Sequence, residues 1–305
     1  MTHVLVVGEP LVELIETPSG APHPGFGGDA LNTAVYLARE GPDLRVSLAS
    51  AVGDDRSSDA LVLLCRSEAL DVSYLRQVPG TEIGRYRVTV DAEGERAFAY
   101  ERSHSPFRGA LDGDGLLPDP AEVDLLYFSG ISIAVLHEPG RRALRDYAME
   151  VRQRGGLIAY DPNHRPALWN APSEARRWLA RIASAADFVL ASADDGRALT
   201  RGTTASEIAV DLRKEGTAEV VVTDGAQPCS ICVGDRIEEV AAELRVRVVD
   251  TTAAGDAFNA GYLAGRLRGL DPVGSAVAGH RLAARVVGHR GAIAPRESSS
   301  EPESS

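Results

Sequence analysis

The sequence predicts an α/β protein with a doubly wound, mostly parallel sheet and a small antiparallel β lid. Continuous apolar runs alternate with helix-like segments along most of the chain, which is typical of a parallel sheet covered on both faces. Between residues 84 and 100 apolar residues instead recur at every second position, which indicates an antiparallel sheet with one solvated face. The chain has 305 residues, 44% of them hydrophobic, which is enough for one large domain or two smaller ones.

The N-terminal part begins with two strand patterns. Residues 3–8 form a continuous apolar run that ends in Gly8, and residues 11–15 predict a second short strand. Residues 18–28 are rich in Gly and Pro, so we expect a loop there. A helix is then predicted at 29–40, a strand at 46–52 and a second helix at 57–68. A hairpin of two strands, 84–90 and 96–100, follows.

From Asp124 the alternation of strands and helices resumes. Strands are predicted at 125–128, 157–160, 188–191, 219–222 and 245–249, with a further hairpin at 230–233 and 238–241. Helices are predicted at 140–154, 173–185, 206–215, 257–269 and 272–287. Ligands of such sheets bind at the carboxyl ends of the strands. We therefore expect one cleft to be bordered by the turns after Val7, Tyr160, Ala191, Val222 and Val249.

Composition limits the possible partners. Acidic residues outnumber basic ones by 44 to 32, and the formal net charge of -12 argues against nucleic acid and anionic membranes as partners. No apolar run reaches the roughly 18 residues of a membrane span, and no signal-peptide pattern precedes the first strand. Three cysteines, an odd number, suit a reducing compartment. We therefore expect a soluble cytoplasmic protein, and we interpret Cys229 and Cys232 as apolar strand residues rather than a redox or zinc half-site.

The most informative stretch covers residues 249–258, where a turn of small residues opens a helix that carries Asp256 in its first turn. Free N–H groups at a helix N-terminus make an anion site, and the small residues Ala253, Ala254 and Gly255 allow an anion to approach the backbone. A carboxylate there is placed to take a proton from a hydroxyl group. Together these features predict phosphoryl transfer to an alcohol. The alternative is an ordinary helix start in which Asp256 only complements the dipole.

A second stretch, residues 25–32, brings Gly28, Asp29 and Asn32 to the start of a helix. Carboxylate and amide groups beside exposed glycine backbone suit a polyol, although Asp29 as a simple helix cap is an alternative. Arg165 follows a predicted strand between two prolines, which places a guanidinium suited to carboxylate or phosphate at the cleft.

The lid hairpin supplies a further group of candidates. Tyr86, Tyr100 and Arg102 lie in or just after it, and we interpret them as a clamp for an acidic sugar, with simple packing of the tyrosines as the alternative. Thr223 and Gly225 flank Asp224 after an apolar strand; they either border a nucleotide or form a plain turn. The motifs of P-loop enzymes, serine hydrolases and zincins are absent from the sequence, and Gly8-Glu9-Pro10 has too few glycines for a dinucleotide fold.

Residues 250–256 resemble the C-terminal signature of the ribokinase-like (PfkB-type) carbohydrate kinases, and residues 27–34 resemble the N-terminal signature of that family. The resemblance extends to about Pro295. Four shorter strings are similar to the 2-keto-3-deoxygluconate kinases of the family: residues 25–29, 127–132, 161–169 and 289–293. We therefore expect one kinase domain over residues 1–295, with a lid from about 9–27 and 81–103, and a disordered tail over residues 296–305.

The resemblance implies roles for individual residues. Asp256 would be the catalytic base, and the backbone of Ala253, Ala254 and Gly255 the anion hole. The residues that would contact the sugar acid are Gly28, Asp29, Asn32, Tyr86, Tyr100, Arg102, Arg165 and Asp250. Those that would border ATP are Asn163, Ser192, Thr223, Gly225 and Gly291. The resemblance also implies Mg²⁺, a homo-oligomer formed through the lid, and a monovalent cation as a further candidate.

Two positions depart from the family pattern. Asp224 stands where relatives often carry a basic or apolar residue, and an acid there would repel phosphate unless it points away. Ser192 and Asp195 replace the usual Asn-x-x-Glu, and Asp195 would reach the metal through water.

The predicted reaction is ATP-dependent phosphorylation of 2-keto-3-deoxygluconate at its terminal hydroxyl, giving 2-keto-3-deoxy-6-phosphogluconate. Two alternatives stay open: a sibling kinase for fructose, ribose, a nucleoside or another keto-deoxy sugar acid, and a non-catalytic sugar-acid-binding protein on the same fold.

Overall fold

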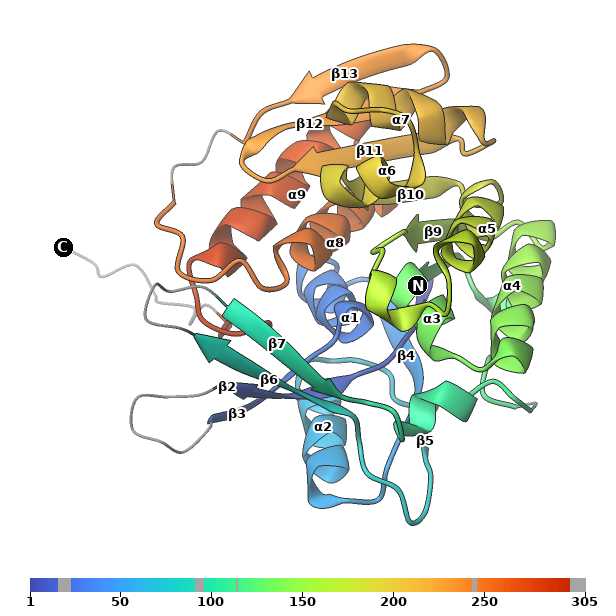
Figure 1. The fold of residues 1–305 in the computed structure, drawn as a ribbon, viewed down its shortest axis with the longest axis vertical. Helices are drawn as coiled ribbons and strands as arrows, with labels where there is room; N and C mark the ends of the chain where they lie inside the picture. The colour runs from blue at the N-terminus through green and yellow to red at the C-terminus, as the bar shows by residue number, and fades with distance from the viewer. Residues whose placement is uncertain (16–22, 91–95, 114, 243–245, 297–305) are drawn as a thin grey trace.

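A nine-stranded sheet forms the centre of the computed structural model, which describes residues 1–305 except 16–22, 91–95, 114, 243–245 and 297–305 (Figure 1). The strand order is β13-β12-β11-β10-β9-β8-β1-β4-β5. The strands from β11 to β5 in this order run parallel, and β12 and β13 add an antiparallel edge. The strands are β1 (His3–Val7), β4 (Arg45–Val52), β5 (Leu75–Gln77), β8 (Leu125–Ser129), β9 (Leu157–Asp161), β10 (Phe188–Ser192), β11 (Glu219–Asp224), β12 (Gln227–Val233) and β13 (Arg236–Val240).

Helices cover both faces of this sheet, as predicted for a doubly wound fold (Figure 1). Alternate residues of β1 face opposite cores: Val4 and Val6 pack with α1 and α8, whereas Leu5 and Val7 pack with α4 and α5. The α-helices are α1 (Asp29–Glu40), α2 (Arg56–Ser67), α3 (Gly130–Val135), α4 (Glu138–Gln153), α5 (Pro172–Ala183), α6 (Ala193–Leu199), α7 (Ala205–Lys214), α8 (Ala254–Leu267) and α9 (Pro272–Val287). None of the helices in the described residues is long and apolar enough to cross a membrane.

A second sheet of four strands stands beside the main one, in the order β3-β2-β6-β7. Its strands are β2 (Leu11–Ile15), β3 (His23–Gly27), β6 (Arg85–Val90) and β7 (Arg96–Glu101). The predicted hairpin is confirmed, because β6 and β7 pair antiparallel. The two antiparallel pairs are joined by β2 and β6, which run parallel, so this small sheet is mixed.

Two sequence expectations were wrong. Residues 23–27 were expected to be loop but form β3, because an edge strand tolerates Pro24 while its other residues pair with β2. Residues 246–249 were expected to be strand, but the structure assigns none there, and Val246 and Val248 are exposed. The amides of Val249 and Asp250 instead donate to the carbonyl of Val287 at the end of α9. Residue 245 and the predicted tail beyond Arg296 lie outside the described residues.

Candidate active site

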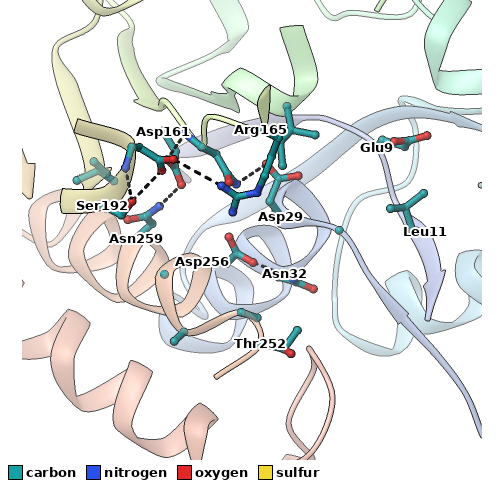
Figure 2. Close-up of a pocket in the computed structure, with 18 of the residues that line it drawn as sticks. Glu9, Leu11, Asp29, Asn32, Asp161, Arg165, Ser192, Thr252, Asp256 and Asn259 are labelled. Atoms are coloured by element: carbon teal, nitrogen blue, oxygen red, sulfur yellow. Dashed lines mark hydrogen bonds and ion pairs between the residues drawn. The ribbon is translucent and has the colours of Figure 1, made fainter. Parts of the chain in front are cut away.

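A cavity of about 520 Å³ opens at the carboxyl ends of the central strands, between the first turns of α1 and α8 and residues of the small sheet (Figure 2). The segments that follow β1, β9 and β10 all contribute to its lining, as does Thr223 of β11, in agreement with the predicted cleft. The predicted residues that line it are Gly28, Asp29, Asn32, Tyr86, Tyr100, Arg102, Asn163, Arg165, Ser192, Asp195, Thr223, Ala253, Ala254, Gly255 and Asp256.

Asp256 lies in the first turn of α8 and faces Asn32 of α1. The side-chain amide of Asn32 donates to Oδ2 of Asp256 over 2.8 Å. Burial, followed by the negative charge of Asp29, raises the pKa of Asp256 to about 7, against the Asn32 hydrogen bond and the charge of Arg165. A carboxylate with a pKa near neutrality is suited to accept a proton from a hydroxyl group.

The backbone at the N-terminus of α8 is accessible from the cavity. Ala253 adopts a left-handed conformation with φ of 62°, which turns the chain sharply into the helix. The Ala254 amide donates to the carbonyl of Thr251 over 3.2 Å, whereas the amides of Gly255 and Asp256 belong to the first turn, which lacks intrahelical acceptors. A side chain at Gly255 would meet no atom within 4 Å, so the space beside this turn is open. The turn therefore combines donors, a positive dipole end and access for an anion.

Hydrogen bonds link several carboxylate and amide side chains near Asp256. The side chain of Asn163 donates to Asp29 over 3.2 Å, and its backbone amide donates to Asp161 over 2.9 Å. Asn259, three residues after Asp256 on α8, donates to the other oxygen of Asp161 over 2.9 Å (Figure 2). Burial, followed by the charges of other cavity acids, raises the pKa of Asp161 well above its usual range. Asp29 is therefore part of this network rather than a helix cap, because Gly28 is the N-cap of α1.

Asp195 is held by three neighbours on the opposite wall. The hydroxyl of Ser192 donates to Oδ2 over 2.9 Å, and the amide of His164 donates to Oδ1 over 2.9 Å. The guanidinium of Arg165 lies 3.5 Å from Oδ1 in an ion pair. Burial raises the pKa of Asp195, while the charge of Arg165 acts against this shift. Arg165 is half-exposed and reaches the cavity from this pair.

The small sheet contributes two tyrosines and an arginine. The rings of Tyr86 and Tyr100 lie 5.7 Å apart, and the hydroxyl of Tyr86 donates to Glu13 over 2.8 Å. Arg102 forms an ion pair with Glu9, the residue that follows Gly8 after β1. The predicted clamp residues thus lie together, and Arg102 has an acidic neighbour, Glu9, that was not predicted.

Three predicted site residues lie outside the cavity lining. Asp250 is buried and accepts hydrogen bonds of 2.8 Å from the amides of Thr252 and Gly291. Gly225 lies at the turn between β11 and β12, with φ of 58°. Their predicted contacts with sugar or nucleotide stay predictions.

Several lining residues were not predicted as site residues, among them Glu9, Asp161 and Asn259. Asp161 and Glu9 directly follow strand patterns, and Asn259 lies three residues after Asp256 on the predicted helix. Position at a strand end and helical spacing were the available signals. Cys229 and Cys232 are buried strand residues of β12, as predicted, and both are free.

Comparison with known proteins agrees with this geometry. The family model of the pfkB family carbohydrate kinases matches residues 1–299. A 2-dehydro-3-deoxygluconokinase of Escherichia coli strain K12 is 35% identical over 302 residues, covering 96% of this chain and 97% of the relative. Among solved structures, the PfkB protein from Polaromonas sp. JS666 has a TM-score of 0.83 and 26% identity, over 94% of this chain and 96% of that one. Fructokinase from Vibrio cholerae O395, in its fructose, ADP and calcium ion bound form, has a TM-score of 0.80 and 24% identity, over 96% and 94% of the two chains.

The fold and the site thus define a sugar kinase. The chain belongs to the pfkB family of carbohydrate kinases.

Proposed function

We propose that the protein transfers the γ-phosphoryl group of MgATP to the terminal hydroxyl of 2-keto-3-deoxygluconate, giving 2-keto-3-deoxy-6-phosphogluconate and ADP. The observation that carries this proposal is a partly buried carboxylate of raised pKa, Asp256, at an open helix N-terminus in a cavity that also holds two arginines. The 35% identity to a curated 2-dehydro-3-deoxygluconokinase, an enzyme named for the same sugar acid, supports the choice of substrate.

In the proposed reaction Asp256 takes the proton of the terminal hydroxyl of the sugar acid while the hydroxyl oxygen forms a bond to the γ-phosphorus of ATP. The bond from that phosphorus to the bridging oxygen breaks, and ADP leaves. The amides of the first turn of α8, at Gly255 and Asp256, donate to the charge of the transferred group. Asn32 orients the Asp256 carboxylate through its hydrogen bond. The first turn of α8 thus supplies both the base and the anion hole.

The sugar acid would lie between α1 and the small sheet. Arg102 and Arg165 would bind its carboxylate, since guanidinium groups match the geometry of carboxylates. The residues that would contact its hydroxyl groups and chain are Gly28, Asp29, Asn32, Tyr86 and Tyr100, with Asp250 as a further predicted contact. Two arginines in the cavity of a chain with a net charge of -12 favour an acidic over a neutral sugar.

The residues present fit a nucleotide that brings its own metal ion. Ser192 and Thr223 lie at the ends of β10 and β11 and would border ATP together with Asn163, Gly225 and Gly291. No group of three or more metal-ligating side chains occurs in the described part of the chain. Mg²⁺ would therefore be held mainly by phosphate and water oxygens, with Asp195 reaching it through water. When bound, Mg²⁺ neutralises charge on the phosphates.

Other finer features stay predictions. They are a monovalent cation, a homo-oligomer formed through the small sheet, and location in the cytoplasm. A sibling kinase for fructose, ribose or a nucleoside is the main alternative, and a sugar-acid-binding protein without activity is the second.

A screen of ADP release tests the proposal. The substrates are 2-keto-3-deoxygluconate, its galactonate epimer, fructose, ribose and a nucleoside, each with MgATP. We expect the highest kcat/KM with a keto-deoxy acid. Preference for a neutral sugar would contradict the proposed substrate. Sugar-acid binding by calorimetry without ADP release would favour the binding protein.

A further inference from the structure

Glu9 and Arg102 form an ion pair at the small-sheet end of the cavity, and Figure 2 shows Glu9 and Ser192 at opposite ends of the residues drawn. Glu9 comes two residues after β1, and Arg102 comes directly after β7. The Glu9 side chain has no exposed surface, and that of Arg102 is only 10% exposed. The pair therefore ties the end of the small sheet to the carboxyl end of a central strand.

Tyr100 and Gly84 are neighbours of the two members of the pair. The guanidinium carbon of Arg102 lies 5.5 Å from the centre of the Tyr100 ring, in a cation–π contact. A Cβ at Gly84 would lie 2.7 Å from the Leu11 side chain and 3.2 Å from Oε1 of Glu9, so a side chain at the residue before β6 would crowd this carboxylate. Burial raises the pKa of Glu9, and the charge of Arg102 together with the Ser105 hydroxyl acts against this shift.

The ion pair leaves two buried polar atoms without a hydrogen-bond partner among the described residues: Oε1 of Glu9 and Nε of Arg102. Glu9 accepts from Nη2 of Arg102, so Arg102 retains unused donors. Because Arg102 lines the cavity, a ligand there can bring an acceptor to the guanidinium donors that Glu9 does not use. A guanidinium has five donors and can serve two carboxylates at once.

We propose that Glu9 is a positioning residue that holds Arg102 in the cavity for the carboxylate of an acidic sugar. This rests on the proposed function, because it assigns that carboxylate to Arg102. Without Glu9, the buried guanidinium would carry an uncompensated charge and turn towards solvent in the free protein. Substrate binding would then have to order and desolvate it again, which weakens binding. Since neither residue contacts Asp256, the loss should appear in KM rather than in kcat.

A double-mutant cycle with Glu9→Gln and Arg102→Ala tests this directly. Glutamine keeps the size of the side chain and removes its charge. We expect Glu9→Gln to raise KM for the sugar acid by about tenfold or more, with kcat changed by less than about threefold. In the Arg102→Ala background the same substitution should change KM by less than about twofold, because Glu9 then has nothing to position. An equal effect in both backgrounds, or an unchanged KM in Glu9→Gln, would overturn the proposal.

Glu68→Gln is the matched control. Glu68 is also a buried glutamate, and it accepts from Arg39 over 2.7 Å, but it does not line the cavity. We expect this variant to lower the melting temperature and leave KM unchanged. A rise in KM similar to that of Glu9→Gln would show that any lost buried ion pair has this effect, and would overturn a specific role for Glu9.

Hydrogen exchange separates failure of this proposal from failure of the proposed function. If the wild-type protein does not phosphorylate any sugar acid, the proposed substrate is wrong, and exchange of the peptide covering residues 100–105 decides the role of Glu9. The proposal that Glu9 positions Arg102 is supported if exchange in Glu9→Gln is faster than in wild type and equal to that in Arg102→Ala. Exchange in the double variant should then be no faster than in either single variant. Exchange unchanged from wild type overturns it.

Discussion

The side chain of Asn32 on α1 donates a 2.8 Å hydrogen bond to the Asp256 carboxylate on α8. The two residues are 224 positions apart, and they meet because α1 and α8 share one core beside the central sheet. The contact joins the two stretches that resemble family signatures into one site. It also lowers the pKa of Asp256, against the larger effects of burial and of Asp29, since a donor to a carboxylate stabilises its charged form.

Asn32→Ala should therefore raise the pKa of Asp256 further. The acidic limb of the pH profile of kcat/KM, which reports the free enzyme, would move to higher pH. Asn170→Ala is the control, because Asn170 is exposed and donates to Glu174 outside the cavity. An acidic limb that stays in place or moves to lower pH in Asn32→Ala would show that this hydrogen bond does not tune the base.

Asp29→Asn should have the opposite effect. The negative charge of Asp29 raises the pKa of Asp256, so its removal should move the acidic limb to lower pH. Asparagine keeps an oxygen that can accept from Asn163. The same pH profiles measure the shift, with the exposed Asp43→Asn as the matched control. A shift to higher pH would contradict this electrostatic coupling.

Asp256→Asn should stabilise the free protein above neutral pH. Folding raises the pKa of Asp256 to about 7, so ionisation of this group destabilises the folded state. The destabilisation is complete above the folded-state pKa and absent below the pKa of the unfolded chain. Asparagine removes this effect. The melting temperature of the variant relative to wild type should rise by about 2 °C or more between pH 5 and pH 8, measured by calorimetry without ligands. A difference that does not change with pH would mean that Asp256 is ionised without penalty.

Arg165→Ala should weaken binding of an acidic sugar selectively. We expect KM for the keto-deoxy acid to rise by about tenfold or more, whereas KM for any neutral sugar that is turned over should change by less than about twofold. Arg177→Ala, an exposed arginine on α5, is the control. Equal losses for acidic and neutral sugars would assign Arg165 to a role other than carboxylate binding, such as holding Asp195.

The order of strands and helices could be predicted because buried parallel strands leave continuous apolar runs, as in residues 3–7 and 125–128. Strand β3 could not be predicted, because its pairing with β2 depends on tertiary structure, which the Gly/Pro composition of the segment does not reveal. Residues 246–249 look like a strand in sequence, but no strand is assigned there, and the amide of Val249 donates to Val287 of α9 instead.

The candidate site was predictable where a residue type and a local turn act together, as at Asp256 and Arg165. Contacts across the fold were not predictable from spacing. The Glu9–Arg102 pair joins two segments 93 positions apart, so the position of Glu9 after a strand could mark it as a lining residue but could not reveal its partner. The same holds for Asn259, whose role depends on meeting Asp161 of another element.

The most direct test of the account is turnover by Asp256→Asn. With the best substrate of the screen and saturating MgATP, we expect kcat for ADP release to fall by about a hundredfold or more, because the hydroxyl proton loses its acceptor. Calorimetry should show sugar and nucleotide binding within about threefold of wild type, since asparagine preserves the shape of the side chain. Near-normal turnover by this variant would contradict the assignment of Asp256 as the base.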